Sequence, residues 1–206
     1  QAAVVAGVRA SSRSDRDFYP LWLANTVLGS GSNGRLFEEV RTKRGLSYGA
    51  YSSLGQSRDP ALLTARAQTR NETASEVAAI ILNQFDDLGA KVLTEEALQK
   101  RRLYLSGSVT RSLETTIGFN SQIASLLLRG LDVEEAFAIA ERISGVSSED
   151  TTDAARRYVS SDKASLVIVG DARIFLDSLT KLRGEVEVIP LEALDLNAPN
   201  LRKAEW

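Results

Sequence analysis

Residues 34–52, GRLFEEVRTKRGLSYGAYS, carry most of the information on the fold of this chain of 206 residues, and a glycine-rich segment leads into them. Gly29, Gly31 and Gly34 have the Gly-x-Gly-x-x-Gly spacing of a dinucleotide-binding loop. Such a loop follows a strand, opens a helix and has an acidic residue about 20 residues later. Here the preceding segment has helical periodicity, and the first acidic residue near that distance is Asp59. Two of the three conditions fail, so the sequence favours a turn between two helices whose glycines supply positive φ angles.

The quoted residues predict a short helix followed by the first strand of a hairpin. Leu36, Phe37 and Val40 recur at helical spacing and are expected to face inward, and Gly45 is expected to end the helix. A turn at residues 57–60 separates two strand-like segments, which we expect to pair as an antiparallel hairpin. Apolar and polar residues alternate in the second segment, so one face of the hairpin should be buried.

The rest of the chain predicts an α+β fold, with a mixed, mostly antiparallel sheet and helices packed on one side. A capping box at residues 73–76 is expected to open a helix, and residues 164–171 form the continuous apolar run of a buried strand. The tail from Gly184 is expected to add an edge strand before Pro190. We expect strands at 2–10, 47–56, 61–70 and 164–171, and helices at 17–29, 35–45, 73–89, 94–109, 117–128, 133–142 and 147–158.

Composition narrows the chemistry that the chain can perform. The sequence has no histidine and no cysteine, which excludes Ser-His-Asp and Cys-His catalysis and zinc sites built on those ligands. A carboxylate site for magnesium or calcium stays open. The sequence has no EF-hand pattern, however, and we expect no catalytic residue, metal or cofactor in this chain. The net charge of −2 provides no field that would attract nucleic acid or an anionic membrane.

Two further groups of residues are weak functional signals. Glu38 and Glu39 are adjacent, so on a helix they point about 100° apart and do not flank one scissile bond. We expect them on a solvated face, with Glu38 pairing with Arg41. The basic segment KRRLY, at residues 100–104, is more typical of a solvated helix face than of a nucleic-acid contact. No apolar run approaches the roughly 18 residues of a membrane span.

The quoted stretch resembles the C-terminal domain of the insulinase/pitrilysin zinc metallopeptidases, which include the mitochondrial processing peptidases and the respiratory core proteins. The resemblance covers residues 1–182, which we expect to be one domain, followed by an extension at 183–206. Since the chain begins at Gln1 without a methionine, we expect a piece of a longer protein. The residues that match the family pattern are Gly34, Arg35, Leu36, Phe37, Val40, Arg41, Gly45, Leu46, Tyr48 and Ser52.

The resemblance implies a non-catalytic half that pairs with a homologous half around a peptide. In the family, the other half carries a His-x-x-Glu-His zinc motif, so zinc is expected on a partner domain or subunit. Arg41 and Tyr48 match an Arg and Tyr pair that contacts the substrate backbone near the zinc. Such a pair can hold a peptide carbonyl and stabilise its developing oxyanion. If neither residue has a functional role, we expect Arg41 to form a surface ion pair with Glu38 and the ring of Tyr48 to pack on the sheet.

The resemblance also implies that Gly29, Gly31 and Gly34 belong to a loop that guides substrate into the space enclosed by the two halves. The exposed edge of one hairpin strand is a candidate for pairing with an extended peptide. The leading hypothesis is therefore a peptide-binding half of a zinc peptidase, which needs a zinc-bearing partner. The alternatives are a structural or assembly protein with the same fold and a nucleotide-binding domain. For the partner, a second copy of this chain in a homodimer also stays open. The compartment stays open, with the bacterial periplasm favoured over the cytoplasm and the mitochondrion.

Overall fold

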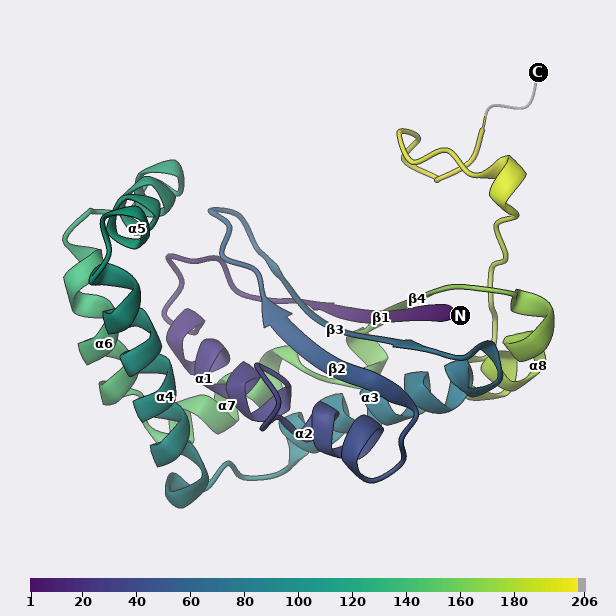
Figure 1. Ribbon diagram of the computed structural model, residues 1–206, viewed down its shortest axis with the longest axis horizontal. Helices are drawn as coiled ribbons and strands as arrows, with labels where there is room; N and C mark the ends of the chain where they lie inside the picture. The colour runs from purple at the N-terminus through teal and green to yellow at the C-terminus, as the bar shows by residue number, and fades with distance from the viewer. Residues whose placement is uncertain (204–206) are drawn as a thin grey trace.

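The computed structural model describes residues 1–203 and has an α+β fold (Figure 1). Its sheet has the strand order β2–β3–β1–β4, and each neighbouring pair is antiparallel. The predicted α+β class and antiparallel pairing are confirmed, although the sheet is not mixed, because no pair among these four strands is parallel. The strands are β1 (Ala2–Arg9), β2 (Ser47–Leu54), β3 (Leu62–Thr69) and β4 (Ser165–Val169).

Helices account for most of the remaining chain, and none of those in residues 1–203 is long and apolar enough to cross a membrane. The predicted caps of two helices are confirmed. The Thr94 hydroxyl accepts from the Ala97 N–H at 3.4 Å, and the Ser147 hydroxyl accepts from the Asp150 N–H at 2.9 Å. The α-helices are α1 (Phe18–Leu28), α2 (Arg35–Phe37), α3 (Ala74–Ala90), α4 (Glu95–Leu113), α5 (Thr116–Leu128), α6 (Glu135–Gly145), α7 (Ser148–Tyr158) and α8 (Ala172–Arg183). The shorter turns are the π-turn η1 (Glu38–Thr42) and the 3-10 turns η2 (Asn71–Thr73), η3 (Ser161–Lys163) and η4 (Leu191–Ala193).

The hydrophobic core lies between one face of the sheet and a layer that contains α1 and α3 (Figure 1). Alternate residues of the strands face this layer, as the period of two requires. The buried face of β1 consists of Ala2, Val4, Ala6 and Val8, each at most 1% exposed. Phe18 of α1 and Phe85 of α3 are fully buried opposite the sheet. Helices α4, α5 and α6 form an arm that rises beyond one end of the sheet (Figure 1).

β4 forms an outer edge of the sheet, which corrects the prediction of a buried strand. Leu166 and Ile168 pack against the core, but Val167 and Val169 are 59% and 69% exposed. Val167 lies beside Val5 of β1 on the face opposite the helical layer. No helix of residues 1–203 covers this open face (Figure 1). The apolar run is continuous because both faces of β4 are apolar, while only one is covered within the chain.

Two further predictions were wrong. Residues 185–190 are irregular, so the expected edge strand before Pro190 does not form. The tail leaves α8 at Gly184, whose φ is +78°, and runs away from the sheet (Figure 1); residues 204–206 of the predicted extension lie outside the described residues. The capping box is also absent, because the Thr73 hydroxyl bonds with Thr69 and with the Arg70 carbonyl instead of capping α3.

Candidate functional site

A turn at Gly45 brings the two predicted substrate-contact residues together. The Gly45 N–H donates to the Arg41 carbonyl, and the Leu46 N–H donates to the Val40 carbonyl, both at 2.9 Å. With Gly45 at a φ of +61°, the bond from Gly45 to Arg41 is that of the αL C-cap motif, which ends the helix formed by α2 and η1. Val40 is buried and Leu46 packs against the core. The chain therefore reverses, and Tyr48 at the start of β2 returns beside Arg41.

The Arg41 guanidinium lies between two aromatic rings. Its carbon is 4.3 Å from the centroid of the Tyr48 ring and 5.3 Å from that of Phe37. Its Nη1 also donates to the Tyr48 carbonyl. Tyr48 is 86% exposed, so its ring is not packed on the sheet as the alternative proposed. Cation–π contacts at exposed positions contribute about 0.5–1 kcal/mol each, which restricts the guanidinium while leaving the phenol hydroxyl free to meet a ligand.

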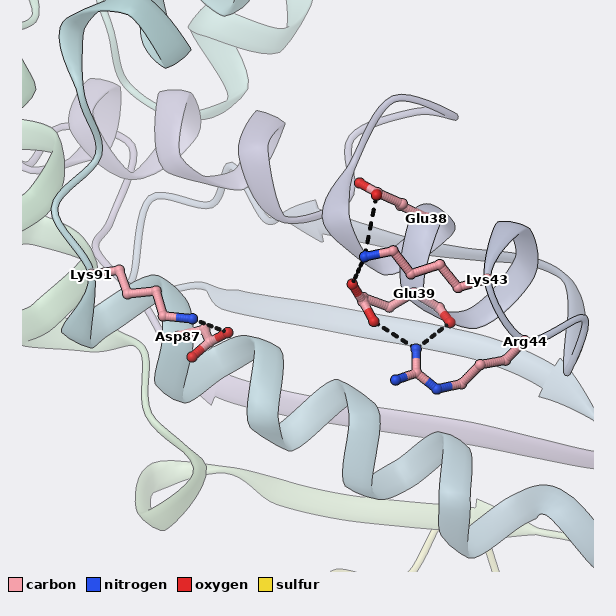
Figure 2. A network of polar contacts seen from close by, with 6 residues as sticks. All are labelled: Glu38, Glu39, Lys43, Arg44, Asp87 and Lys91. Carbon is pink, nitrogen blue, oxygen red and sulfur yellow. Dashed lines mark hydrogen bonds and ion pairs between the residues drawn. The ribbon is translucent and has the colours of Figure 1, made fainter.

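The acidic residues beside Arg41 are bound by other cations (Figure 2). Lys43 Nζ lies 2.6 Å from Glu39 Oε1 and 3.3 Å from Glu38 Oε1, and Arg44 Nη1 lies 2.6 Å from Glu39 Oε2. Hydrogen bonds from Lys43 and Arg44 lower the pKa of Glu39. No carboxylate in residues 1–203 forms an ion pair with Arg41, so the expected Glu38–Arg41 pair is absent. Arg41 therefore keeps its charge available at the surface.

The glycine-rich turn is shaped by close backbone contacts more than by positive φ angles. Gly31 has a φ of +103°, but Gly29 has an extended φ of −174° and Gly34 a φ of −76°. A Cβ on Gly34 would lie 2.5 Å from the Gly29 Cα, and a Cβ on Gly29 would lie 2.8 Å from the Ser52 backbone nitrogen. The prediction that these glycines all supply positive φ is thus correct for Gly31 alone.

The turn also lacks the context of a nucleotide site. The element before it is α1, a helix, and the Gly29 carbonyl accepts from the Ser52 N–H at 2.9 Å. That bond ties the turn to the outer edge of β2 and satisfies one outward group of this edge strand. The Tyr48 carbonyl is similarly used by Arg41. Of the two hairpin strands, only β2 lies at an edge of the sheet, and its own chain already occupies part of that edge.

The donor groups of this chain do not fit the zinc centre that the resemblance implies. Zinc is bound by histidine, cysteine and carboxylate side chains, and the first two residue types are absent from the sequence. Among the residues that the structure describes, no three acidic side chains gather into a group that could hold a metal ion. Residues 1–203 therefore offer no set of ligands that fits a zinc ion.

The family model of the peptidase M16 inactive domain matches residues 1–105. This chain belongs to the peptidase M16 family. The match includes both Arg41 and Tyr48 and confirms the resemblance to the non-catalytic domain of zinc metallopeptidases. A crystal structure of a peptidase M16 inactive domain from Pseudomonas fluorescens has the same fold, with a TM-score of 0.73 and 23% identity over 81% of this chain and 40% of that one.

Several curated relatives of this M16 domain are named as uncharacterized zinc proteases, and one is named as a non-peptidase homolog. An uncharacterized zinc protease of Streptomyces coelicolor is 31% identical over 173 residues, which cover 82% of this chain and 37% of the relative. A non-peptidase homolog of Helicobacter pylori is 22% identical, over 71% of this chain and 34% of the relative. The chain spans about two fifths of the length of the first curated relatives that it matches.

Sequence reasoning missed two aromatic neighbours of the candidate site in this M16 domain. Phe37 contacts the Arg41 guanidinium, and the centroids of the Phe37 and Tyr51 rings are 5.9 Å apart. The four-residue spacing of Phe37 and Arg41 could have indicated their contact, since such residues are neighbours on a helix. No pattern in residues 38–42 predicted the π-helical turn η1, although such turns occur often at functional sites.

Proposed function

We propose that this M16 inactive domain binds peptide and completes an active site whose zinc is held by a homologous domain or subunit. The observation that carries the proposal is the stacking of the half-buried Arg41 guanidinium on the exposed ring of Tyr48. The geometry supports it because a restricted guanidinium and a phenol hydroxyl lie side by side at the surface, free of any carboxylate within residues 1–203.

In this proposal the two side chains act on the peptide group that is cleaved. Arg41 donates N–H bonds to a substrate carbonyl, and the Tyr48 hydroxyl donates to the same oxygen or to its neighbour. Both donors are held before substrate arrives, so they stabilise negative charge that develops on the oxygen with little reorganisation. The turn containing Gly29, Gly31 and Gly34 borders the same helix and guides the peptide towards it. The peptidase-like domain occupies residues 1–182, and 183–206 are an extension.

A structural or assembly role is the second candidate. The Helicobacter pylori relative is named as a non-peptidase homolog, so the fold exists in proteins so described. A scaffold of this kind would need neither the exposed Tyr48 ring nor an unpaired Arg41. Substitution of these two residues should therefore impair a substrate-binding domain and leave a scaffold unaffected.

The test uses the whole assembly, with this chain joined to or mixed with its zinc-bearing half. Arg41→Ala and Tyr48→Phe should each lower kcat/KM for peptide cleavage about 100-fold, or about 3 kcal/mol, as losing one oxyanion donor does. Arg44→Ala is the matched control, because Arg44 is a neighbouring exposed arginine that bonds to Glu39. The free energy of unfolding should change by less than about 1 kcal/mol in all three variants.

Unchanged cleavage with both Arg41→Ala and Tyr48→Phe would reject the substrate role and favour the scaffold. An equal loss with Arg44→Ala would show that general surface charge, and not the stacked pair, accounts for the effect. The zinc content of the partner should be the same with every variant, which separates a lost donor from a disturbed metal centre.

A further inference from the structure

Two segments far apart in the sequence meet beside the glycine-rich turn. Arg101 Nη2 of α4 donates to the Asn33 carbonyl at 2.5 Å. The Tyr104 hydroxyl lies 3.9 Å from the position that a Cβ on Gly31 would occupy. The basic segment KRRLY of residues 100–104 is therefore not only a solvated helix face, since part of it packs on the turn. Arg35, the first residue of α2, comes directly after that turn.

This cluster of Arg35, Arg101 and Tyr104 carries positive charge that the chain does not neutralise. Within residues 1–203, neither Arg35 nor Arg101 forms an ion pair with a carboxylate, whereas the adjacent Arg102 is bound by Glu95. Burial and the charge of Arg35 both lower the pKa of Arg101. Two guanidinium groups that repel each other beside an exposed tyrosine are a favourable environment for an anion.

We propose that Arg35, Arg101 and Tyr104 form a subsite that recognises a carboxylate of the bound peptide. Guanidinium groups match the planar, two-oxygen geometry of a carboxylate, and Tyr104, which is 59% exposed, supplies a further hydroxyl donor. The Arg101 bond to Asn33 holds one guanidinium against the turn. This subsite rests on the proposed function, because it takes the ligand to be the same peptide that Arg41 and Tyr48 contact.

The position of the subsite sets where the carboxylate should lie. Arg35 and Arg41 are six residues apart on the continuous helix formed by α2 and η1, which corresponds to about 9 Å along its axis. An extended peptide advances about 3.3 Å per residue. Because six residues are not a whole number of helical turns, the two side chains also point in different directions around the axis. The carboxylate should therefore lie three or more residues from the peptide group held by Arg41. It comes either from an acidic side chain or from the C-terminus of a short peptide.

The experiment compares peptides that differ in one charge. A glutamate is placed at successive positions around the cleavage site of a peptide cut by the whole assembly, with glutamine at the same positions as the neutral reference. Each peptide is made with a free and with an amidated C-terminus. We expect glutamate at one position at least about three residues from the cleaved bond to raise kcat/KM about tenfold over glutamine, an advantage that salt reduces. If the C-terminal carboxylate is the ligand, a peptide with a free C-terminus should instead have a higher kcat/KM than its amide, with glutamate and glutamine equivalent at every position.

Variants assign this preference to the cluster. Arg35→Gln and Arg101→Gln should each abolish the preference, so that one variant cleaves the glutamate peptide and the matching glutamine peptide with the same kcat/KM. Arg35→Glu should reverse it in favour of a lysine peptide, which a merely unfolded turn would not do. Arg111→Gln, which removes the same charge from the far end of α4, is the control and should keep the preference.

The subsite would be overturned if wild type, Arg35→Gln and Arg101→Gln showed the same preference. It would also be overturned if wild type preferred neither glutamate over glutamine nor a free C-terminus over an amide. Fluorescence anisotropy of the same peptides with the assembly separates this result from failure of the proposed function. Loss of acidic-peptide binding in Arg35→Gln supports the subsite even if Arg41→Ala proves harmless to cleavage. Acidic-peptide binding that is unchanged in the variants rejects the subsite even if Arg41 and Tyr48 are essential.

Discussion

Gly45 determines whether Arg41 and Tyr48 can meet. Its φ of +61° lies in the left-handed region, where a Cβ is sterically unfavourable. Apart from Gly45 and its chain neighbours, no atom of residues 1–203 lies within 4 Å of the position that a Cβ on Gly45 would occupy. The effect of a side chain at this position is therefore conformational and does not involve a clash. The helix stop at Gly45 was predictable from the sequence, because glycine is the usual residue at the C′ position.

A pair of substitutions at Gly45 tests this dependence. Gly45→Ala should lower the free energy of unfolding by about 1 kcal/mol, because alanine resists the left-handed conformation. Gly45→Asn should be less destabilising, because asparagine enters that region more readily. Chemical denaturation measures both changes. Equal losses for alanine and asparagine would show that the φ angle of residue 45 is not the cause.

Other single residues show where sequence reasoning reached its limit. Thr73 and Glu76 have the spacing of a capping box, but a bond to Thr69 of the neighbouring strand competes for the Thr73 hydroxyl. Gly29 and Gly34 were recognised as unusual, yet the reason is the approach of their backbones, which depends on how α1, α2 and β2 meet. A local pattern identifies such residues without showing which tertiary contact uses them.

At the scale of elements, a buried polar cluster joins α1 to α6. Arg13 Nη2 donates to the Tyr19 hydroxyl at 2.9 Å, and that hydroxyl donates to Glu135. Arg142 Nη2 lies 2.9 Å from the second oxygen of Glu135. Arg13 is 4% exposed and Tyr19 is 9% exposed. No local pattern in the sequence predicts these contacts, because 116 positions separate Tyr19 from Glu135.

Tyr19→Phe tests how much this cluster attaches the arm of α4, α5 and α6. Removing the hydroxyl leaves Arg13 and Glu135 short of a partner, so the free energy of unfolding should fall by about 1–3 kcal/mol at pH 7. Burial, together with the hydrogen bond to Glu135, raises the pKa of Tyr19 to about 12. Between about pH 10 and 12 the unfolded chain therefore loses the Tyr19 proton while the folded chain keeps it, and stability falls as the pH rises.

The difference in stability between wild type and Tyr19→Phe should accordingly be constant below about pH 9 and shrink from pH 10 to 12. Denaturation at several pH values measures it, and other titrating groups cancel because both proteins contain them. Tyr104→Phe, at an exposed tyrosine, should match wild type at pH 7. A Tyr19→Phe difference that stays constant up to pH 12 would contradict a raised pKa for Tyr19.

The elements themselves were largely predictable, because strand alternation and helical spacing are local. The hairpin of β2 and β3, and helices α4, α5 and α7, lie where their patterns placed them. The burial of β4 was not predictable. A continuous apolar run looks the same in the sequence whether the chain covers both faces of the strand or only one. In this protein one face stays uncovered, and Val167 and Val169 are exposed on it.

For the whole molecule, the open sheet face fits the proposed pairing of two halves. Val5, Val167 and Val169 are apolar residues that the chain itself leaves exposed. Such exposed apolar surface often marks an interaction site, and the chain spans about two fifths of its first curated relatives. The partner could not be derived from composition and periodicity, which gave only an α+β domain. The long motif from Gly34 to Ser52 pointed to it by resemblance.

The same pairing predicts how the isolated chain behaves towards metal. With no histidine or cysteine in the sequence and no cluster of acidic ligands in residues 1–203, the purified chain should contain no stoichiometric zinc and cleave no peptide. Its midpoint of thermal unfolding should be the same with and without a chelator, because no metal contributes to its stability. Metal analysis and calorimetry of the chain alone provide these measurements. Adding the zinc-bearing half should produce cleavage that a chelator abolishes, and Arg41→Ala should weaken that cleavage without altering the bound zinc. One tightly held zinc per isolated chain, lost together with stability on chelation, would show that this domain supplies metal ligands of its own.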